Sequence, residues 1–234
     1  YETMLALREE LRREPGYRGL DSVVEYGTFF LCNADDPGLV VFPTHRVVHS
    51  LPAFDARDLL RRAAALFDID ERAAPPTSAA EVKATLALKG QRAPSFLVIS
   101  QGVAAYLTLR TDLDLSTALR GPRVLQQLDV SVLHALLIED LLGVDRAAQE
   151  SMTNLRYLKD TGKALRAAAD PQNQAVFLMN PTPVSQVMAV ADAGEVMPQK
   201  STYFFPKIAS GIVLSPLDPS EPIATAAEAV CSTT

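Results

Sequence analysis

The sequence predicts an α+β protein with mixed, largely antiparallel sheets, packed helices and one central apolar helix. Short apolar runs such as Ser95–Ser100 and Ala104–Leu109, separated by the turn pair Gln101-Gly102, are typical of a β-hairpin. Other segments repeat apolar residues at helical spacing behind a capping residue. The segment that begins at Leu128 is so apolar that a helix formed there would lie in the core.

Residues 1–120 are expected to form one α+β subdomain. Its first 14 residues have an apolar stripe at helical spacing and stop at a Pro-Gly pair, which predicts a helix. The run Ser22–Leu31 is rich in Val and aromatic residues and predicts a strand. After the turn at Asp35–Gly38, Leu39–Phe42 is expected to return as its partner in a hairpin.

Two further helices and a strand are expected before residue 120. Asp55 is positioned to cap a helix whose buried face carries Leu and Phe, and Ser78 to cap a second helix that ends at Gly90. Phe67–Glu71 predicts a short strand between them.

Residues 121–214 are expected to form a second subdomain that meets the first near residues 120–150. Its central helix starts after Leu128, with Asp129 or Ser131 as the cap, and ends at Gly143. A β-α-β unit should follow, then one more strand, and finally a tail with at most a short helix. These elements are expected at Asn154–Leu158, 164–169, Ala175–Met179, Gly211–Leu214, 215–234 and Ala224–Val230.

Composition excludes several classes of protein. The formal net charge of −6 argues against nucleic-acid binding, which requires a basic face. Cys32 and Cys231 lie far apart and form no metal or disulfide pattern, which favours a reducing, cytoplasmic location. No apolar run is long enough to span a membrane. The motifs of dinucleotide oxidoreductases, zinc hydrolases, serine hydrolases and P-loop enzymes are absent, and no metal site is predicted.

An anion-binding site is predicted in the stretch Gln174–Lys207. A buried strand is followed at once by a helix that Thr182 is placed to cap, and the N–H groups at the start of such a helix attract anions. The later block Lys200–Thr202 supplies a cation and two hydroxyls. The candidate anion- or nucleotide-binding residues are therefore Asn180, Thr182, Lys200, Ser201, Thr202 and Lys207. In the plainer interpretation, Thr182 only caps and Lys200 only ends a loop.

Two histidines and an arginine are candidate catalytic residues. His45 and Arg46 form an imidazole–guanidinium pair beside a strand, which suits anion binding or proton transfer. His134 interrupts the central apolar helix, where a polar side chain needs a partner or a cavity. The alternatives are a surface turn for the first pair and a hydrogen-bonded core histidine for His134.

The block Met179–Lys207 closely resembles the C-terminal signature of domain-of-unknown-function family 1015. Pro43–Arg46 and Leu128–His134 resemble further blocks of that family in the same order. Members are similar to the ParB and sulfiredoxin class, in which an Asp-Gly-His-His-Arg-like turn holds nucleotide phosphates. This sequence lacks that turn and opens on the Tyr1–Leu5 segment that follows it in the family, so we expect the chain to be the C-terminal part of a longer protein.

The resemblance implies a nucleotide-dependent phosphotransferase that acts on a small metabolite, with magnesium accompanying the nucleotide. In this hypothesis Lys200 stabilises phosphate charge, while His45 or His134 moves a proton. A non-catalytic module that binds a phosphorylated ligand or a protein partner is the first alternative. The second is that residues 197–207 are purely structural. Homo-oligomer formation is left open by the sequence.

Overall fold

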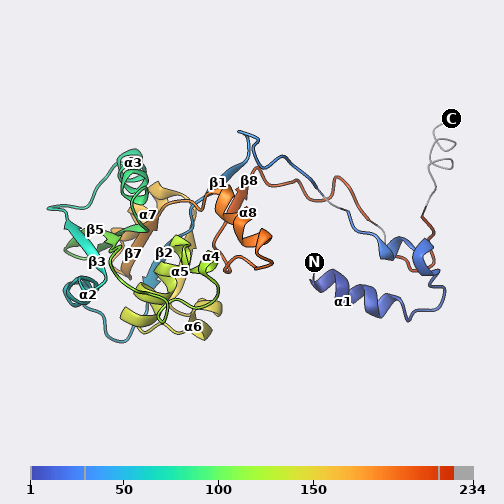
Figure 1. Cartoon of the computed structure of the whole chain (residues 1–234), viewed down its shortest axis with the longest axis horizontal. Helices are drawn as coiled ribbons and strands as arrows, with labels where there is room; N and C mark the ends of the chain where they lie inside the picture. The colour runs from blue at the N-terminus through green and yellow to red at the C-terminus, as the bar shows by residue number, and fades with distance from the viewer. Residues whose placement is uncertain (1, 29, 216, 224–234) are drawn as a thin grey trace. The chain divides into compact units, whose positions relative to one another are not determined.

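The computed structural model describes residues 2–28, 30–215 and 217–223. Contacts divide the chain into two units, one formed by Tyr1–Asp36 with Lys207–Thr234 and the other by Pro37–Pro206. The larger unit, Pro37–Pro206, holds most of the helices and all the strands described below (Figure 1). Strands from both of the expected parts, 1–120 and 121–214, lie in its main sheet.

The main sheet has six strands, and each pair of neighbours is antiparallel. In spatial order they are β3 (Phe67–Glu71), β5 (Val103–Leu109), β4 (Ser95–Ser100), β7 (Asn173–Met179), β2 (His45–His49) and β6 (Leu155–Leu158). Strands β6 and β7 both flank β2, so they run parallel to each other with β2 between them. The expected β-α-β unit is therefore a split one, whose gap is filled by a strand from far earlier in the chain.

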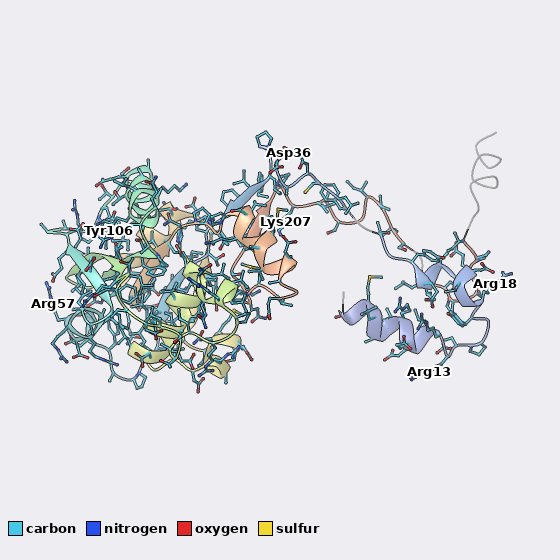
Figure 2. All side chains as sticks on the ribbon, in the orientation of Figure 1. Arg13, Arg18, Asp36, Arg57, Tyr106 and Lys207 are labelled. Carbon is cyan, nitrogen blue, oxygen red and sulfur yellow. The ribbon has the colours of Figure 1, made fainter. Side chains whose placement is uncertain are left out.

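Helices cover both faces of this sheet because alternate strand residues are apolar on both sides. On one face lie α3 (Ala79–Gly90) and α7 (Thr161–Ala168), which pack on Val47 and Val176. Helices α2 (Ala56–Ala63), α5 (Asp129–Val132) and η3 (Leu133–Leu141) contribute to the core on the other face. The remaining helices of this unit are α4 (Arg123–Gln126), α6 (Arg146–Glu150) and α8 (Val184–Asp192). At the surface, Arg57 of α2 forms an ion pair of 2.6 Å with Glu71 of β3 (Figure 2).

The central apolar helix is present, but most of it is wound as a π-helix. After the single turn of α5, η3 continues for nine residues from Leu133 to Leu141. Five of those residues are buried. π-Helical segments are rare and often occur at functional sites, because the wider turn displaces side chains from the regular helical positions. His134 lies in the first turn of η3.

A second, two-stranded sheet contains part of the signature block, as we call Met179–Lys207. Strand β1 (Val40–Phe42) pairs antiparallel with β8 (Tyr203–Phe205), and Phe42 packs edge-on against Phe205 with ring centroids 5.5 Å apart. This pairing corrects the predicted hairpin, in which Leu39–Phe42 would have joined Ser22–Leu31.

The smaller unit contains α1 (Glu2–Leu11) and two single turns, η1 (Gly19–Asp21) and η2 (Val23–Glu25). Glu25 accepts hydrogen bonds from Arg12 at 2.7 and 2.6 Å and from Tyr17 at 2.7 Å. These bonds, led by the one from Arg12, lower the pKa of Glu25 to about 2. The polar cluster therefore holds α1 against the η2 turn.

Several expected elements differ from the structure. The strand predicted at Ser22–Leu31 is wrong, because its described residues form the η2 turn and a loop; Phe29 lies outside the described residues. No strand occurs at Gly211–Leu214. The expected helix at Ala224–Val230 and Cys231 also lie outside the described residues. In the small unit, apolar side chains such as Leu31 and Leu214 remain more than four-fifths exposed, so Val and Phe content alone misled the strand prediction.

Other predictions are confirmed. The α+β class holds, the hairpin over 95–109 forms as β4 and β5, and Phe67–Glu71 is a strand with the predicted bounds. Asp55 and Ser78 each cap a helix by accepting a backbone N–H. The predicted caps at Thr182 and at Asp129 or Ser131 are wrong, because Pro183 and Leu128 occupy those N-cap positions.

Candidate functional site

Arg46 is the polar centre of the larger unit. It lies on β2 and is completely buried. Its Nε–H donates to Nε2 of His134 at 3.0 Å, and one terminal nitrogen donates to the carbonyl oxygen of Lys200 at 3.3 Å. The other terminal nitrogen donates to the carbonyl of Thr44 and lies 3.4 Å from the sulfur of Met179. The guanidinium therefore ties β2 to both η3 and the signature block.

The positive charge of Arg46 has no carboxylate partner among the described residues. Burial lowers the pKa of Arg46 to about 10, and the group still carries its charge at neutral pH. The guanidinium carbon stands 5.1 Å from the centroid of the Tyr157 ring, a cation–π distance. Burying a cation without a counter-charge costs free energy, and its positive potential favours the binding of an anion nearby.

His134 accepts one hydrogen bond and donates another. Because Arg46 donates to Nε2, the ring proton sits on Nδ1 and is donated to the side-chain oxygen of Gln149, whose amide donates in turn to the carbonyl of Val144 at 2.7 Å. Burial, followed by the charge of Arg46, lowers the pKa of His134 to about 4. At neutral pH the ring is uncharged and holds the guanidinium in place.

His45 points to the opposite face of the sheet, as strand alternation requires for the neighbour of Arg46. Its Nδ1 accepts the backbone N–H of Met179 at 3.3 Å, and its Nε2–H donates to the hydroxyl of Thr161 at 3.2 Å. Burial, followed by the charge of Arg46, lowers the pKa of His45 to about 4. The structure therefore brings Arg46 together with His134, and it places His45 with α7.

A pocket of about 600 Å³ lies along β6 and the signature block. We call it the basic pocket; the residues that define it are Thr44, Arg156, Tyr157, Lys159, Lys200 and Thr202. Three of these are cationic, and none of the described residues that line the pocket is acidic. Lys159 stands over the ring of Tyr203, with its Nζ 3.4 Å from the centroid. The pocket thus has the charge that a phosphate requires.

The signature block presents its residues through an unusual backbone. Lys200 has a φ of 57°, in the left-handed region that non-glycine residues seldom adopt, and Arg46 holds its carbonyl. Ser201 is 3% exposed, and its hydroxyl has no hydrogen-bond partner within the described chain. Thr202 lines the basic pocket. Strain and an unsatisfied hydroxyl in so short a block are typical of functional sites.

Three other candidate residues lie elsewhere. The amide of Asn180 donates to the carbonyl of Leu86 at 2.9 Å and so ties β7 to α3. Thr182 is 5% exposed and does not line the basic pocket. Lys207 belongs to the smaller unit.

Sequence reasoning missed Arg156, Tyr157 and Lys159. Arg156 and Tyr157 lie in the strand expected at Asn154–Leu158 and Lys159 comes directly after it, but nothing in the sequence indicates that this strand pairs with β2 and lines a pocket with Lys200. The described residues contain no group of three or more His, Cys, Asp or Glu that could hold a metal ion. None of the described helices is both long and apolar enough to cross a membrane.

Fold and site together define an α+β protein with a basic pocket built over a buried arginine. The chain belongs to the family described as protein of unknown function (DUF1015), whose model matches residues 1–131. The signature block, Met179–Lys207, lies beyond that match, and the likeness to the ParB and sulfiredoxin class stays a prediction. No curated protein matches the chain.

Solved structures show a distant likeness. A conserved hypothetical protein from Pyrococcus furiosus is 14% identical, with a TM-score of 0.42, over 75% of this chain and 60% of its own. A free serine kinase in complex with AMP is 14% identical, with a TM-score of 0.41, over 75% of this chain and 57% of its own. A mutant of free serine kinase in complex with ADP is 12% identical, with a TM-score of 0.39 and the same coverage. The chain thus spans less than two thirds of the length of these structures.

Proposed function

We propose that Pro37–Pro206 is the phosphate-binding part of a nucleotide-dependent phosphotransferase that acts on a small metabolite. The observation that carries this proposal is the basic pocket, where cationic residues gather without an acidic one among the described lining residues, beside the buried charge of Arg46. The choice of a nucleotide as the phosphate donor rests on the resemblance of the signature block to its family.

Electrostatics favours an anion at this place. Lys159 and Lys200 carry charges of one sign into a shared space, and no ion pair among the described residues neutralises either of them. Arg46 adds a charge that water does not screen, because its side chain is completely buried. Binding a phosphate relieves this repulsion, whereas a cation or a neutral ligand would not.

Three residues of the pocket have a role in the proposed chemistry. Lys159 and Lys200 stabilise charge on the phosphate oxygens, and the hydroxyl of Thr202 donates a hydrogen bond. Phosphoryl transfer asks little covalent chemistry of a protein, so positioning and charge are the main contributions. The pocket offers no described carboxylate to magnesium, so phosphate oxygens and water would hold that ion there. Neither His45 nor His134 has a free ring nitrogen, and our proposal gives both a positioning role.

A non-catalytic module that senses a phosphorylated ligand is the second candidate. One observation favours it: the described lining of the basic pocket contains neither a carboxylate nor a histidine that could act as a general base. The same pocket would then bind phosphate without turnover.

Phosphate and ADP binding by calorimetry tests the proposal. Lys200→Ala should weaken both ligands by about tenfold, since a hydrogen bond to a charged group contributes about 1.5–3 kcal/mol. Lys163→Ala is the matched control, because Lys163 is an exposed lysine of α7 that does not line the pocket. Equal affinities in the two variants would show that the basic pocket is not the phosphate site. Transfer of the terminal phosphoryl group of ATP or ADP to a component of metabolite pools, measured as a phosphorylated product, then separates the enzyme from the sensor.

A further inference from the structure

A second pocket opens on the side of Tyr157 that faces η3. It has a volume of about 410 Å³ and we call it the mixed pocket; its charged lining residues are Arg120, Glu139, Arg146 and Glu150. Two are positive and two are negative, so their formal charges cancel. Arg120 and Glu139, which both line the pocket, form an ion pair of 3.1 Å with each other. The mixed pocket therefore differs from the basic pocket in the charge that it offers a ligand.

The two pockets share one wall. Tyr157 lines both of them. The signature block does the same along its length, since Pro198 and Gln199 line the mixed pocket while Lys200 and Thr202 line the basic pocket. Ligands bound in the two pockets would therefore both lie beside Tyr157 and beside one short loop.

Arg46 contacts both parts of this shared wall, the Tyr157 ring and the loop at Lys200. Its guanidinium stands 5.1 Å from the centre of the Tyr157 ring and donates to the Lys200 carbonyl at 3.3 Å. It also donates to His134, which lines the mixed pocket. One buried residue thus contacts both parts of the wall and a side chain of the mixed pocket, which fixes the two pockets relative to each other.

We propose that the mixed pocket binds the phosphoryl acceptor, a small zwitterion that bears a hydroxyl group. This inference rests on the proposed function and names the acceptor class for it. In the transfer, the acceptor oxygen bonds to the terminal phosphorus as the bond from that phosphorus to the bridging oxygen breaks. The electron pair of the broken bond leaves with the nucleotide, and the hydroxyl proton is released to water.

The charges of the lining select this class of acceptor. A second phosphate in the mixed pocket would meet the carboxylates of Glu139 and Glu150, and like charges repel at such distances. A purely apolar ligand would desolvate four charged side chains without replacing their water. A molecule with one carboxylate and one ammonium group can instead pair with Arg146 and Glu150, which form no ion pair with other described residues. The volume of the pocket is at the lower end of the range for small-molecule sites, so the acceptor is small.

Four small probes test the proposal. L-Serine carries the hydroxyl and both charges, 3-hydroxypropionate lacks the ammonium, ethanolamine lacks the carboxylate, and L-alanine lacks the hydroxyl. Calorimetry with the chain saturated by ADP should show serine binding at least about tenfold more tightly than 3-hydroxypropionate and ethanolamine, because one charge-assisted contact is lost in each. Serine and ADP should also strengthen each other by the same factor, as thermodynamic linkage requires.

Substitutions assign the binding to the mixed pocket. Arg146→Ala should weaken serine by about tenfold and leave ADP unchanged, whereas Arg123→Ala, an exposed arginine of α4 that does not line the pocket, should change neither. Serine that binds no better than the single-charge probes, or that is indifferent to Arg146→Ala, overturns the acceptor proposal. If Lys200→Ala weakens ADP binding in the same experiment, the phosphate site in the basic pocket is retained and only the acceptor proposal is overturned. If ADP also fails to bind, the proposed function is overturned with it.

Discussion

The two faces of the main sheet treat buried polar groups in opposite ways. His45 and Arg46 are neighbours in β2 and are almost equally buried, at 1% and 0% exposure. Alternation along the strand sends them to opposite faces. On the α3 and α7 face, His45 bonds only to groups that lie inside the fold, the Met179 N–H and the Thr161 hydroxyl. On the η3 face, the bonds of Arg46 lead to residues that line two pockets.

Burial and a shifted pKa do not by themselves mark a functional group. Burial lowers the pKa of both histidines to about 4. Yet His45 completes a closed set of hydrogen bonds, whereas His134 supports an arginine that has no carboxylate partner among the described residues. Whether a buried group can influence a ligand therefore depends on whether its hydrogen-bond partners line a pocket. Substitutions on the η3 face should therefore change both stability and ligand binding, and those on the α7 face should change stability alone.

Arg46→Met should have the largest effect. The variant leaves Nε2 of His134 and the carbonyls of Lys200 and Thr44 without their donor, which should lower the free energy of unfolding by about 4 kcal/mol. Phosphate binding should be lost as well, because Lys200 is no longer held. Urea unfolding and calorimetry measure the two effects, with Arg46→Lys as the variant that keeps the charge. An Arg46→Met protein that still binds phosphate normally would contradict the proposed difference between the two faces, because Arg46 would then have only a structural role, like His45.

The fold was largely predictable because its signals are local. The β4–β5 hairpin, the helix caps at Asp55 and Ser78, and the strand at Phe67–Glu71 depend on residues near one another in the sequence, and each is present. The hairpin predicted from Ser22 to Phe42 failed because β1 instead pairs with β8, more than 150 residues later. No local pattern reports such a pairing.

For the candidate site, the sequence selects residue types but does not show which of them lie together. A lysine beside hydroxyls at 200–202 and an arginine at 46 could be selected from their chemistry. Their meeting depends on β2 lying between β6 and β7, which brings Tyr157 beside Arg46. The predicted cap at Thr182 failed because a proline, which fits an early helical position in general, itself occupies the N-cap. Topology, which the sequence does not reveal, decides which polar groups share a space.

Acid should destabilise the protein by the next largest amount. Both histidines have a folded pKa of about 4, below the ordinary value of 6.5, so the unfolded chain binds more protons between those values and stability is lost as the pH falls from 6.5 to 4. Burial raises the pKa of Asp129 to about 6, which acts in the opposite direction between pH 6 and 3.8. The net loss between pH 7 and 4 should be on the order of 3 kcal/mol.

Urea unfolding at several pH values, with one histidine replaced at a time, separates the two faces. His45→Gln and His134→Gln should each flatten the slope of stability against pH between 6.5 and 4. A folded His134→Leu protein should also have altered phosphate binding at neutral pH, because leucine offers Arg46 no acceptor, whereas His45→Leu should not. Equal effects of both variants on phosphate would mean that the two faces communicate.

Thr161→Val should have the smallest effect and gives the cleanest test of the closed face. Valine keeps the volume of threonine and removes only the hydroxyl that accepts from His45, at a distance of 3.2 Å. Leaving the Nε2–H of His45 unpaired in a buried place should cost about 1–2 kcal/mol of stability. The affinities for phosphate and ADP should stay within twofold of the wild type, since the described lining of neither pocket includes His45 or Thr161. A larger change in ligand affinity than in stability would contradict this separation of the two faces. It would show that His45 acts on the site through Met179, whose backbone N–H donates to His45 and whose sulfur lies beside Arg46.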